Sequence, residues 1–249
     1  MFAASDRDRL RDHVLHRATA DARVVAGAVV GSLAYSEGDR WSDLDLTFAV
    51  ADGVSILEVL DDFTVDLARR FDAVRLFDLP GGPAIYRVFL LPGCLQFDLS
   101  FAPAAEFGAV GPEFRLLFGR AVEKPHSLPP EAQQLFGYAV HHALRARISI
   151  ERGRHWQAAY WIGAVRDHAL SLNCRRRGLP VHHGRGVDAL PQSVRDEAAG
   201  ALVSSLSRQE LLRALGCGIQ LLLRDVEEVR EMAMKVESQL RALAAPVLR

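Results

Sequence analysis

Residues 31–50 read GSLAYSEGDRWSDLDLTFAV, and this stretch decides the fold. The pair Gly31-Ser32 follows an apolar run, residues 24–30, that is typical of a buried strand. From Asp43 to Val50, polar and apolar residues alternate. A period of two predicts a second strand in which Asp43 and Asp45 share one face, with their Cβ atoms about 6–7 Å apart.

Two carboxylates at this spacing favour a divalent cation. Like charges so close together repel each other, and a bound cation removes that repulsion. Mg²⁺ typically takes one or two carboxylates together with substrate phosphates. Backbone N–H groups and the hydroxyl of Gly31-Ser32 are suited to holding such phosphates. The stretch therefore predicts a magnesium and phosphate site.

A third carboxylate lies in a similar pattern further along the chain. Residues 95–101 alternate again, with Gln96, Asp98 and Ser100 on the polar face. If this strand lies near the first, Asp98 joins Asp43 and Asp45. The sequence leaves open whether Asp98 is a further metal ligand or a general base that accepts a proton from a hydroxyl group.

These residues resemble the nucleotidyltransferase superfamily that includes DNA polymerase β. The family pattern is a strand ending in Gly-Ser, a loop, Asp-x-Asp on the next strand and a later third Asp. The positions that match this pattern are Gly31, Ser32, Asp43, Asp45 and Asp98, and Ser42 fits the residue before the first Asp. The chain is most similar to bacterial enzymes of the aminoglycoside and lincosamide nucleotidyltransferase type.

One departure from the family concerns the triphosphate. Many members carry Arg and Gly just after Gly-Ser, whereas this chain has Leu33, Tyr35 and Ser36. We expect Arg40 to take the place of that arginine. The resemblance also implies that a glycine-flanked basic residue contacts phosphates from a loop of the second half. Arg185 occupies that place, in the stretch RRRGLPVHHGRGVD of residues 175–188.

The resemblance implies a Mg²⁺-dependent enzyme. We expect it to transfer a nucleotidyl group, by default an adenylyl group from ATP, to a hydroxyl of a small molecule such as an antibiotic. The alternatives are a nucleotidyltransferase that acts on RNA or protein and a non-catalytic nucleotidyltransferase-like interaction module. The acceptor and the nucleoside triphosphate are not identified by any residue.

Composition and charge narrow the class of protein. The chain of 249 residues has 49% hydrophobic and 24% charged residues, which is normal for a globular protein. Residues 1–17 are charged and contain no apolar stretch suited to a signal peptide, and no segment approaches roughly 20 apolar residues, so we expect a cytoplasmic protein that does not enter membranes. The three cysteines suggest neither disulfides nor zinc.

The two halves differ in charge. Residues 1–120 carry a net charge of −6 and residues 121–249 one of +5. A basic second half suits a triphosphate or an anionic acceptor, and it does not favour a positively charged aminoglycoside. The near-neutral total charge of −1 and the compact second half argue against a nucleic-acid partner.

The periodicity predicts an α+β fold in which a mixed sheet is followed by a helical bundle. We place a nucleotidyltransferase catalytic domain at 1–122 and a helical substrate-binding domain at 123–249, since residues 123–130 contain three prolines. In a helix predicted over 54–71, Leu57, Leu60, Val65 and Leu67 are the expected buried positions. Further helices are expected at 5–19, 130–152, 155–177 and 192–206, and strands at 23–30, 73–77, 85–91 and 95–101. A capping box of Ser207 and Glu210 predicts the start of one more helix, and the last stretch, to about residue 243, has apolar positions spaced for bundle packing.

Aromatic residues of the second half allow two interpretations. Trp156 and Tyr160 are four residues apart and share a helix face. Such a pair is able to stack on a base or cover a sugar ring, but it more often packs in a core. We favour core packing.

Overall fold

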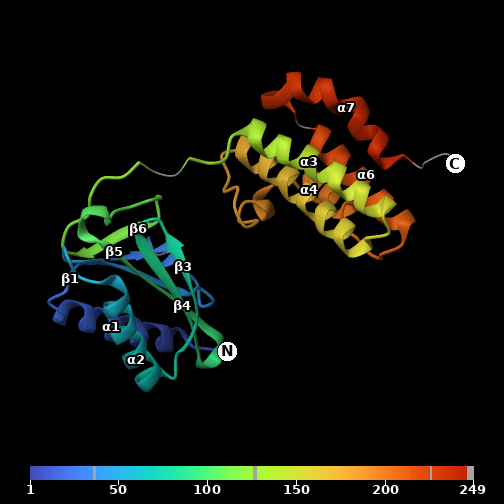
Figure 1. Ribbon diagram of the computed structural model, residues 1–249. Helices are drawn as coiled ribbons and strands as arrows, with labels where there is room; N and C mark the ends of the chain where they lie inside the picture. The colour runs from blue at the N-terminus through green and yellow to red at the C-terminus, as the bar shows by residue number, and fades with distance from the viewer. Residues whose placement is uncertain (36–37, 126–127, 225, 246–249) are drawn as a thin grey trace. The chain divides into compact units, whose positions relative to one another are not determined.

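A computed structural model of the chain describes residues 1–35, 38–125, 128–224 and 226–245. The chain divides into two compact units, Met1–Ser127 and Leu128–Arg249. The first contains a mixed six-stranded sheet with helices, and the second is helical (Figure 1). The predicted α+β class is therefore confirmed. The catalytic and substrate-binding roles given to residues 1–122 and 123–249 stay predictions.

The first unit is built on one sheet with the strand order β3-β4-β5-β2-β1-β6. Strands β2 and β5 run parallel, and the other neighbouring pairs run antiparallel. The strands are β1 (Val24–Val30), β2 (Leu44–Val50), β3 (Val74–Gly81), β4 (Ala84–Leu91), β5 (Leu95–Pro103) and β6 (Phe114–Phe118). The helices are α1 (Ala4–Ala20) and α2 (Ile56–Phe71), and the short 3₁₀ helix η1 (Gly31–Ala34) follows β1.

One face of this sheet carries the main core. Helices α1 and α2 lie on the same side of the sheet (Figure 1) and bury leucine, valine and phenylalanine side chains against it. The alternation in β2 and β5 decides which strand side chains point there. Leu44, Leu46, Phe97 and Leu99 are all at most 1% exposed. Each full burial of such a side chain contributes about 1.5–3 kcal/mol.

The helix α2 shows that two expected core positions are wrong. Leu57 is 50% exposed and Val65 is 67% exposed, whereas Leu60 and Leu67 are buried as expected. Ser55 caps the helix by accepting the N–H of Glu58. The face that points to the sheet contains Val59, Leu60, Phe63 and Leu67, a spacing that fits 3.6 residues per turn.

The opposite face of the sheet is divided between a small apolar cluster and polar side chains. Phe107 packs there against Ala26, Ala28 and Ala49. The rest of this face carries the polar residues of β2 and β5, including Ser100, whose hydroxyl donates to Thr47 Oγ1 at 2.8 Å. The acidic residues therefore lie on the sheet face that neither α1 nor α2 covers.

A buried arginine ties three elements of the first unit together. Arg87 on β4 is 1% exposed, and it donates to both carboxylate oxygens of Asp78 on β3. Its Nη1 donates to Asp61 and Thr64 on α2, at 2.7 and 2.8 Å. These contacts hold the pKa of Asp78 below its ordinary value, chiefly through the hydrogen bond from Arg87. The carboxylates compensate for the burial of the guanidinium charge.

The second unit packs helices around a core that is rich in alanine. Its helices are α3 (Ala132–Glu151), α4 (His155–Arg176), α5 (Gln192–Gly200), α6 (Arg208–Arg224) and α7 (Arg230–Ala244). Ala139, Ala143 and Ala146 follow one stripe of α3 and are fully buried, as are Ala158 and Ala169 on α4. Small side chains at these positions let neighbouring helices approach closely.

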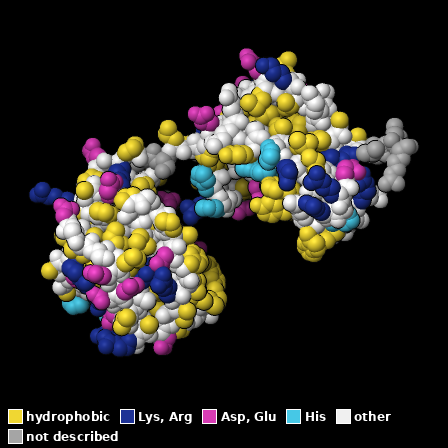
Figure 2. Space-filling view, viewed as in Figure 1, with side chains coloured by type: hydrophobic (Ala, Val, Ile, Leu, Met, Phe, Trp, Pro, Cys, Tyr) yellow, Lys and Arg dark blue, Asp and Glu magenta, His cyan; other side chains and the backbone are white. Residues whose placement is uncertain are grey.

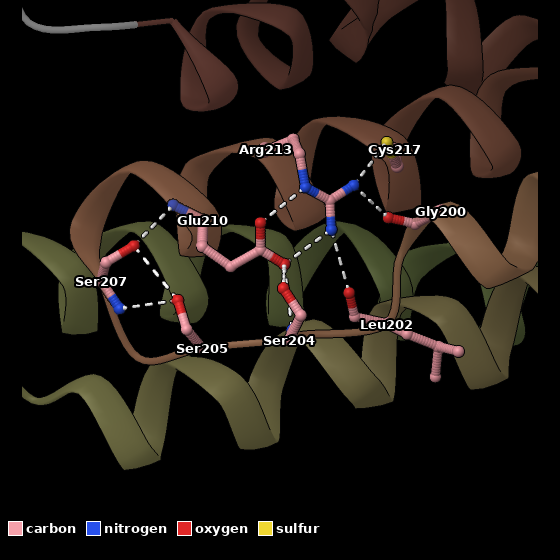
Figure 3. A network of polar contacts seen from close by, with 8 residues as sticks. All are labelled: Gly200, Leu202, Ser204, Ser205, Ser207, Glu210, Arg213 and Cys217. Atoms are coloured by element: carbon pink, nitrogen blue, oxygen red, sulfur yellow. Dashed lines mark hydrogen bonds and ion pairs between the residues drawn. The ribbon is translucent and has the colours of Figure 1, made fainter.

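Helix α5 ends at Gly200, earlier than the predicted end at residue 206, because side chains of α6 hold the following segment (Figure 3). Arg213 donates to the carbonyl oxygens of Gly200 and Leu202 and to Glu210. Glu210 in turn accepts the N–H and the hydroxyl of Ser204. These bonds lower the pKa of Glu210 to about 2. At the start of α6, Ser207 accepts the N–H of Glu210, as in a capping box, whereas the Glu210 carboxylate binds Ser204.

The aromatic pair on α4 is not in the core. Trp156 is 81% exposed and Tyr160 is 68% exposed, so the interpretation that both pack inside the bundle is wrong. Their neighbour Trp161 takes the inward position and packs against the core. Of the described helices, none has both the length and the apolar character that crossing a lipid bilayer requires.

Candidate functional site

The parallel pair β2–β5 places two predicted aspartates side by side. In this register Asp45 lies opposite Asp98, and Thr47 lies opposite Ser100. Parallel neighbours are about 4.8 Å apart in the backbone, so the two carboxylates extend from adjacent points of the sheet. Both side chains are half-buried. The expectation that Asp98 comes from a strand beside the Asp-x-Asp strand is therefore confirmed.

Gly31 lies against the carboxylate of Asp45. Its φ of +70° is one that side chains other than glycine rarely adopt. A Cβ atom at this position would meet Asp45 Oδ2 at 2.7 Å. Glycine is therefore required twice here, by the backbone conformation and by the close approach.

Strand β6, which the sequence did not predict, holds the turn that Gly31 begins. The N–H of Gly31 donates to the carbonyl of Glu113 at 3.1 Å. Arg115 Nε donates to the carbonyl of Ala34, and the Tyr35 hydroxyl donates to the carbonyl of Phe114. Because the Gly31 N–H is engaged within the chain, it does not fit the predicted contact with a phosphate in this conformation. Ser32, half-buried on the same turn, keeps its predicted role as a phosphate ligand.

Asp43 precedes β2, and an arginine that the sequence did not single out holds the loop before it. Arg7 on α1 is 7% exposed, and its Nη1 donates to the carbonyl oxygens of Asp39 and Ser42, both at 2.8 Å. Backbone carbonyls as partners leave no trace in the sequence, which explains why Arg7 was not found. The residue fixes the chain immediately before Asp43.

The surroundings of Asp98 change its pKa. Burial raises its pKa above the ordinary value, and the negative charge of nearby Asp43 raises it further. The hydrogen bond from Gln96 Nε2 to Asp98 Oδ1, at 3.0 Å, acts in the opposite direction. A carboxylate with a raised pKa is a better proton acceptor, so this environment suits a general base.

Two further predicted nucleotide ligands belong to the loop before β2. Ser42 closes a turn with Asp39, accepting the Asp39 N–H at 3.0 Å and donating its hydroxyl to Asp39 Oδ1 at 3.3 Å. Arg40 lies over the ring of Trp41, 4.1 Å from its centroid, and both side chains are exposed. The contacts described for Ser42 and Arg40 are with Asp39 and Trp41, and none is with Asp45. Their contacts with a nucleotide stay predictions.

Arg185 belongs to the second unit. It is exposed in the loop between α4 and α5, where its N–H donates to the carbonyl of His182 at 3.2 Å. Gly184, with a φ of +72°, supplies the turn before it. The contact of Arg185 with a triphosphate stays a prediction.

The chemistry of the donors suits Mg²⁺. Asp43, Asp45 and Asp98 provide hard carboxylate oxygens, and the mutual repulsion of Asp43 and Asp98 is the kind that a cation relieves. Among the described residues, no group of three or more His, Cys, Asp or Glu side chains is arranged to hold a metal ion. The side chains therefore fit a site in which one or two carboxylates and substrate phosphates share the cation, rather than a cage made by the protein alone.

Comparison with models of known protein families and with curated proteins finds no match. Among solved structures, the chain is similar to an aminoglycoside 6-adenyltransferase from Bacillus subtilis. The two are 12% identical, the similarity covers 95% of this chain and 97% of the other, and the TM-score is 0.40. A likeness of this degree supports no conclusion about activity or substrate.

Proposed function

We propose that the chain transfers a nucleotidyl group, adenylyl by default, from a nucleoside triphosphate to a hydroxyl group of a small molecule. The observation that carries the proposal is the close packing of Gly31 against the Asp45 carboxylate, which lies beside Asp98 on the sheet face opposite α1 and α2. Asp43 directly precedes the strand that carries Asp45, and burial together with the charge of Asp43 raises the pKa of Asp98.

Each residue has a role in this proposal. Ser32 holds phosphate oxygens through its N–H and hydroxyl, and Gly31 leaves space beside Asp45. Asp43 and Asp45 would hold Mg²⁺. When bound, the ion neutralises charge on the phosphates and on the departing group. Arg7 positions the loop that ends at Asp43.

Asp98 takes the proton in this proposal. The acceptor hydroxyl oxygen forms a bond with the α-phosphorus while the bond from that phosphorus to the β-phosphate oxygen breaks. Pyrophosphate leaves with the electron pair, and the hydroxyl proton moves to Asp98. The raised pKa of Asp98 favours this step, because the carboxylate binds a proton more readily than an exposed aspartate does.

The test measures pyrophosphate release from ATP with Mg²⁺ and a panel of small hydroxyl compounds that includes aminoglycosides and lincosamides. We expect release that depends on one compound and falls at least about a thousandfold in Asp45→Asn, because a metal contact is worth several kcal/mol. Asp52→Asn is the matched control, since Asp52 is an exposed acid just beyond the other end of β2. Similar rates in both variants, or release that requires RNA, would refute the proposal.

A further inference from the structure

A surface of the second unit combines exposed aromatic rings with arginines, and the proposed transfer reaction does not use it. Residues 132–176, which form α3, α4 and their turn, contain two acidic residues and seven arginines, namely Arg145, Arg147, Arg152, Arg154, Arg166, Arg175 and Arg176. Figure 2 shows basic, histidine and hydrophobic side chains gathered over this part of the second unit.

The acidic residues of this hairpin are already bound to arginines. Glu151 accepts from Arg147 and Arg208, at 2.7 and 2.6 Å. Asp167 accepts from Arg166 at 2.7 Å. Within the described contacts, Arg145, Arg152 and Arg154 form no ion pair. Their positive charge is therefore not neutralised by the carboxylates of the hairpin.

Aromatic side chains follow α3 and α4, with exposed rings on the outside and half-buried rings behind them. Trp156 and Tyr160 are the most exposed of them and share one face of α4. Tyr160 meets the edge of Trp161, with ring centroids 4.9 Å apart, and Arg145 lies 6.0 Å from the Trp161 centroid. Beyond Trp161 the stack continues through His142 and His168, with centroids 4.9 and 5.0 Å apart.

A groove beside Tyr160 is large enough for a planar ring. Its volume is about 450 Å³, and Tyr160 forms one wall while Leu202 and Val203 contribute another. Gly163 and Ala164 leave space next to the tyrosine ring, and Arg166 lies on the lining as well. Leu202 is 53% exposed, so the groove has an apolar wall that is accessible from outside.

We infer that the α3–α4 hairpin binds single-stranded nucleic acid, with bases stacked on Trp156 and Tyr160 and phosphates held by Arg152, Arg154 and Arg145. Exposed aromatic rings and unpaired arginines are the two elements that such binding requires. A duplex keeps its bases stacked on one another, so it cannot offer them to these rings. The argument against a nucleic-acid partner relied on the total charge and on the compact second half, and a total charge does not reveal a local cluster of arginines.

The experiment measures the binding of fluorescein-labelled oligouridylate to the full chain by fluorescence anisotropy. We expect Trp156→Ala/Tyr160→Ala to weaken binding at least about tenfold, because each stacked base contributes on that scale. Met234→Ala/Lys235→Ala on α7 removes an exposed apolar side chain and a cation from the same unit, and it should bind like the unaltered chain. Circular dichroism checks that both variants are folded.

Salt dependence and a competitor distinguish stacking from simple charge attraction. Arg152→Gln/Arg154→Gln should reduce the slope of log affinity against log salt by about 1.4, or about 0.7 for each lost phosphate contact. No binding of oligouridylate at about 0.05 M salt overturns the inference. So does unchanged affinity in the aromatic variant, or equal competition by inorganic polyphosphate, which has charge but no bases.

The binding test is independent of the proposed transfer reaction. Asp45→Asn should bind oligouridylate as the unaltered chain does, since Asp45 belongs to the first unit. Photocrosslinking followed by peptide mapping should place the RNA on α4. A crosslink confined to the first unit contradicts the inference and leaves the proposed transfer untouched, whereas an inactive enzyme that binds RNA on α4 contradicts only the proposed transfer.

Discussion

The two units bury their interiors in different ways. The first packs phenylalanine rings between a sheet and two helices, with Phe48, Phe63 and Phe101 in mutual contact at 5.3–6.4 Å between centroids. The second packs helices over alanines such as Ala143 and Ala158. Large rings fill the space between layers, whereas small side chains bring backbones together. We therefore expect the removal of a buried charge to destabilise mainly the first unit. A bulky substitution in the core or a drop in pH should destabilise mainly the second.

The largest expected effect concerns the buried arginine of the first unit. Arg87→Met removes the partner of Asp78 and Asp61 but fills a similar volume. The free energy of unfolding of the first unit should fall by about 3 kcal/mol, because Asp78, whose side chain is 21% exposed, loses both hydrogen bonds from Arg87. Hydrogen exchange read by mass spectrometry measures the loss separately in each unit.

Arg75→Ala is the control for this substitution. Arg75 also binds Asp78, at 2.7 Å, but its side chain is 47% exposed. An exposed pair is worth about 0–1 kcal/mol, so protection should change little. If Arg87→Met reduced the protection from hydrogen exchange equally in both units, the units would not unfold separately, and their interiors could not be compared in this way.

The next effect concerns the sheet face opposite α1 and α2, where Gly31 lies against Asp45. Gly31→Ala places a methyl group 2.7 Å from Asp45 Oδ2 and forces alanine into a positive φ. We expect nucleotidyl transfer to fall about a hundredfold, because displacement of a reacting group by about 1 Å has that effect. Gly53→Ala has a φ of +79° with open space around the added atom, so it carries the same backbone strain without the clash. Equal activity in the two variants would remove Gly31 from the site.

Overpacking should affect the second unit. Ala143→Leu adds three carbon atoms to a fully buried position between helices. The expected loss is about 1–3 kcal/mol in the unfolding free energy of the second unit, because α3 must shift away from its neighbours. Leu144→Ala alters the next residue, which is 47% exposed, and should cost much less. Hydrogen exchange measured at increasing temperature reports the stability of each unit. A loss of stability confined to the first unit would contradict the packing argument.

The sequence predicted what local periodicity determines and missed what distant contacts determine. Alternation in residues 43–50 and 95–101 was sufficient to place Asp45 and Asp98 on polar strand faces, and the register confirms it. Strand β6 was missed because residues 114–118 read FRLLF, which has no alternation, and because its pairing with β1 is a long-range contact. The hydrogen bond from the Gly31 N–H to the carbonyl of Glu113, just before β6, is also a long-range contact and was missed for the same reason.

Helix faces were predicted less well than strand faces. Leu57 and Val65 are apolar but lie on the outer side of α2, and the same holds for Trp156 and Tyr160 on α4. Apolar residues also occur on the exposed face of a helix. The presence of apolar residues alone therefore does not predict which face of the helix is buried. In a strand with a period of two, by contrast, one buried side chain determines the orientation of all the others.

The smallest expected effect is a pH dependence of the second unit. Burial lowers the pKa of His142, as do the charges of His168 and His141, and burial also lowers the pKa of His168. The folded pKa values thus lie below the ordinary value of about 6.5, so the unfolded chain binds protons at a higher pH. Stability of the second unit should therefore be complete above that pH and fall progressively as the pH drops below it.

The first unit supplies the internal reference for this measurement. Hydrogen exchange at a series of pH values, corrected for the intrinsic rate, should show that α3 and α4 lose protection below pH about 6.5 before the strands of the first unit do. His168→Gln should flatten the dependence, because one of the two depressed groups is gone. His183→Gln, an exposed histidine in the loop after α4, should leave it unchanged. A dependence that His168→Gln does not alter would mean that other groups of the second unit bind the protons, and the stacked histidines would then have no part in its response to acid.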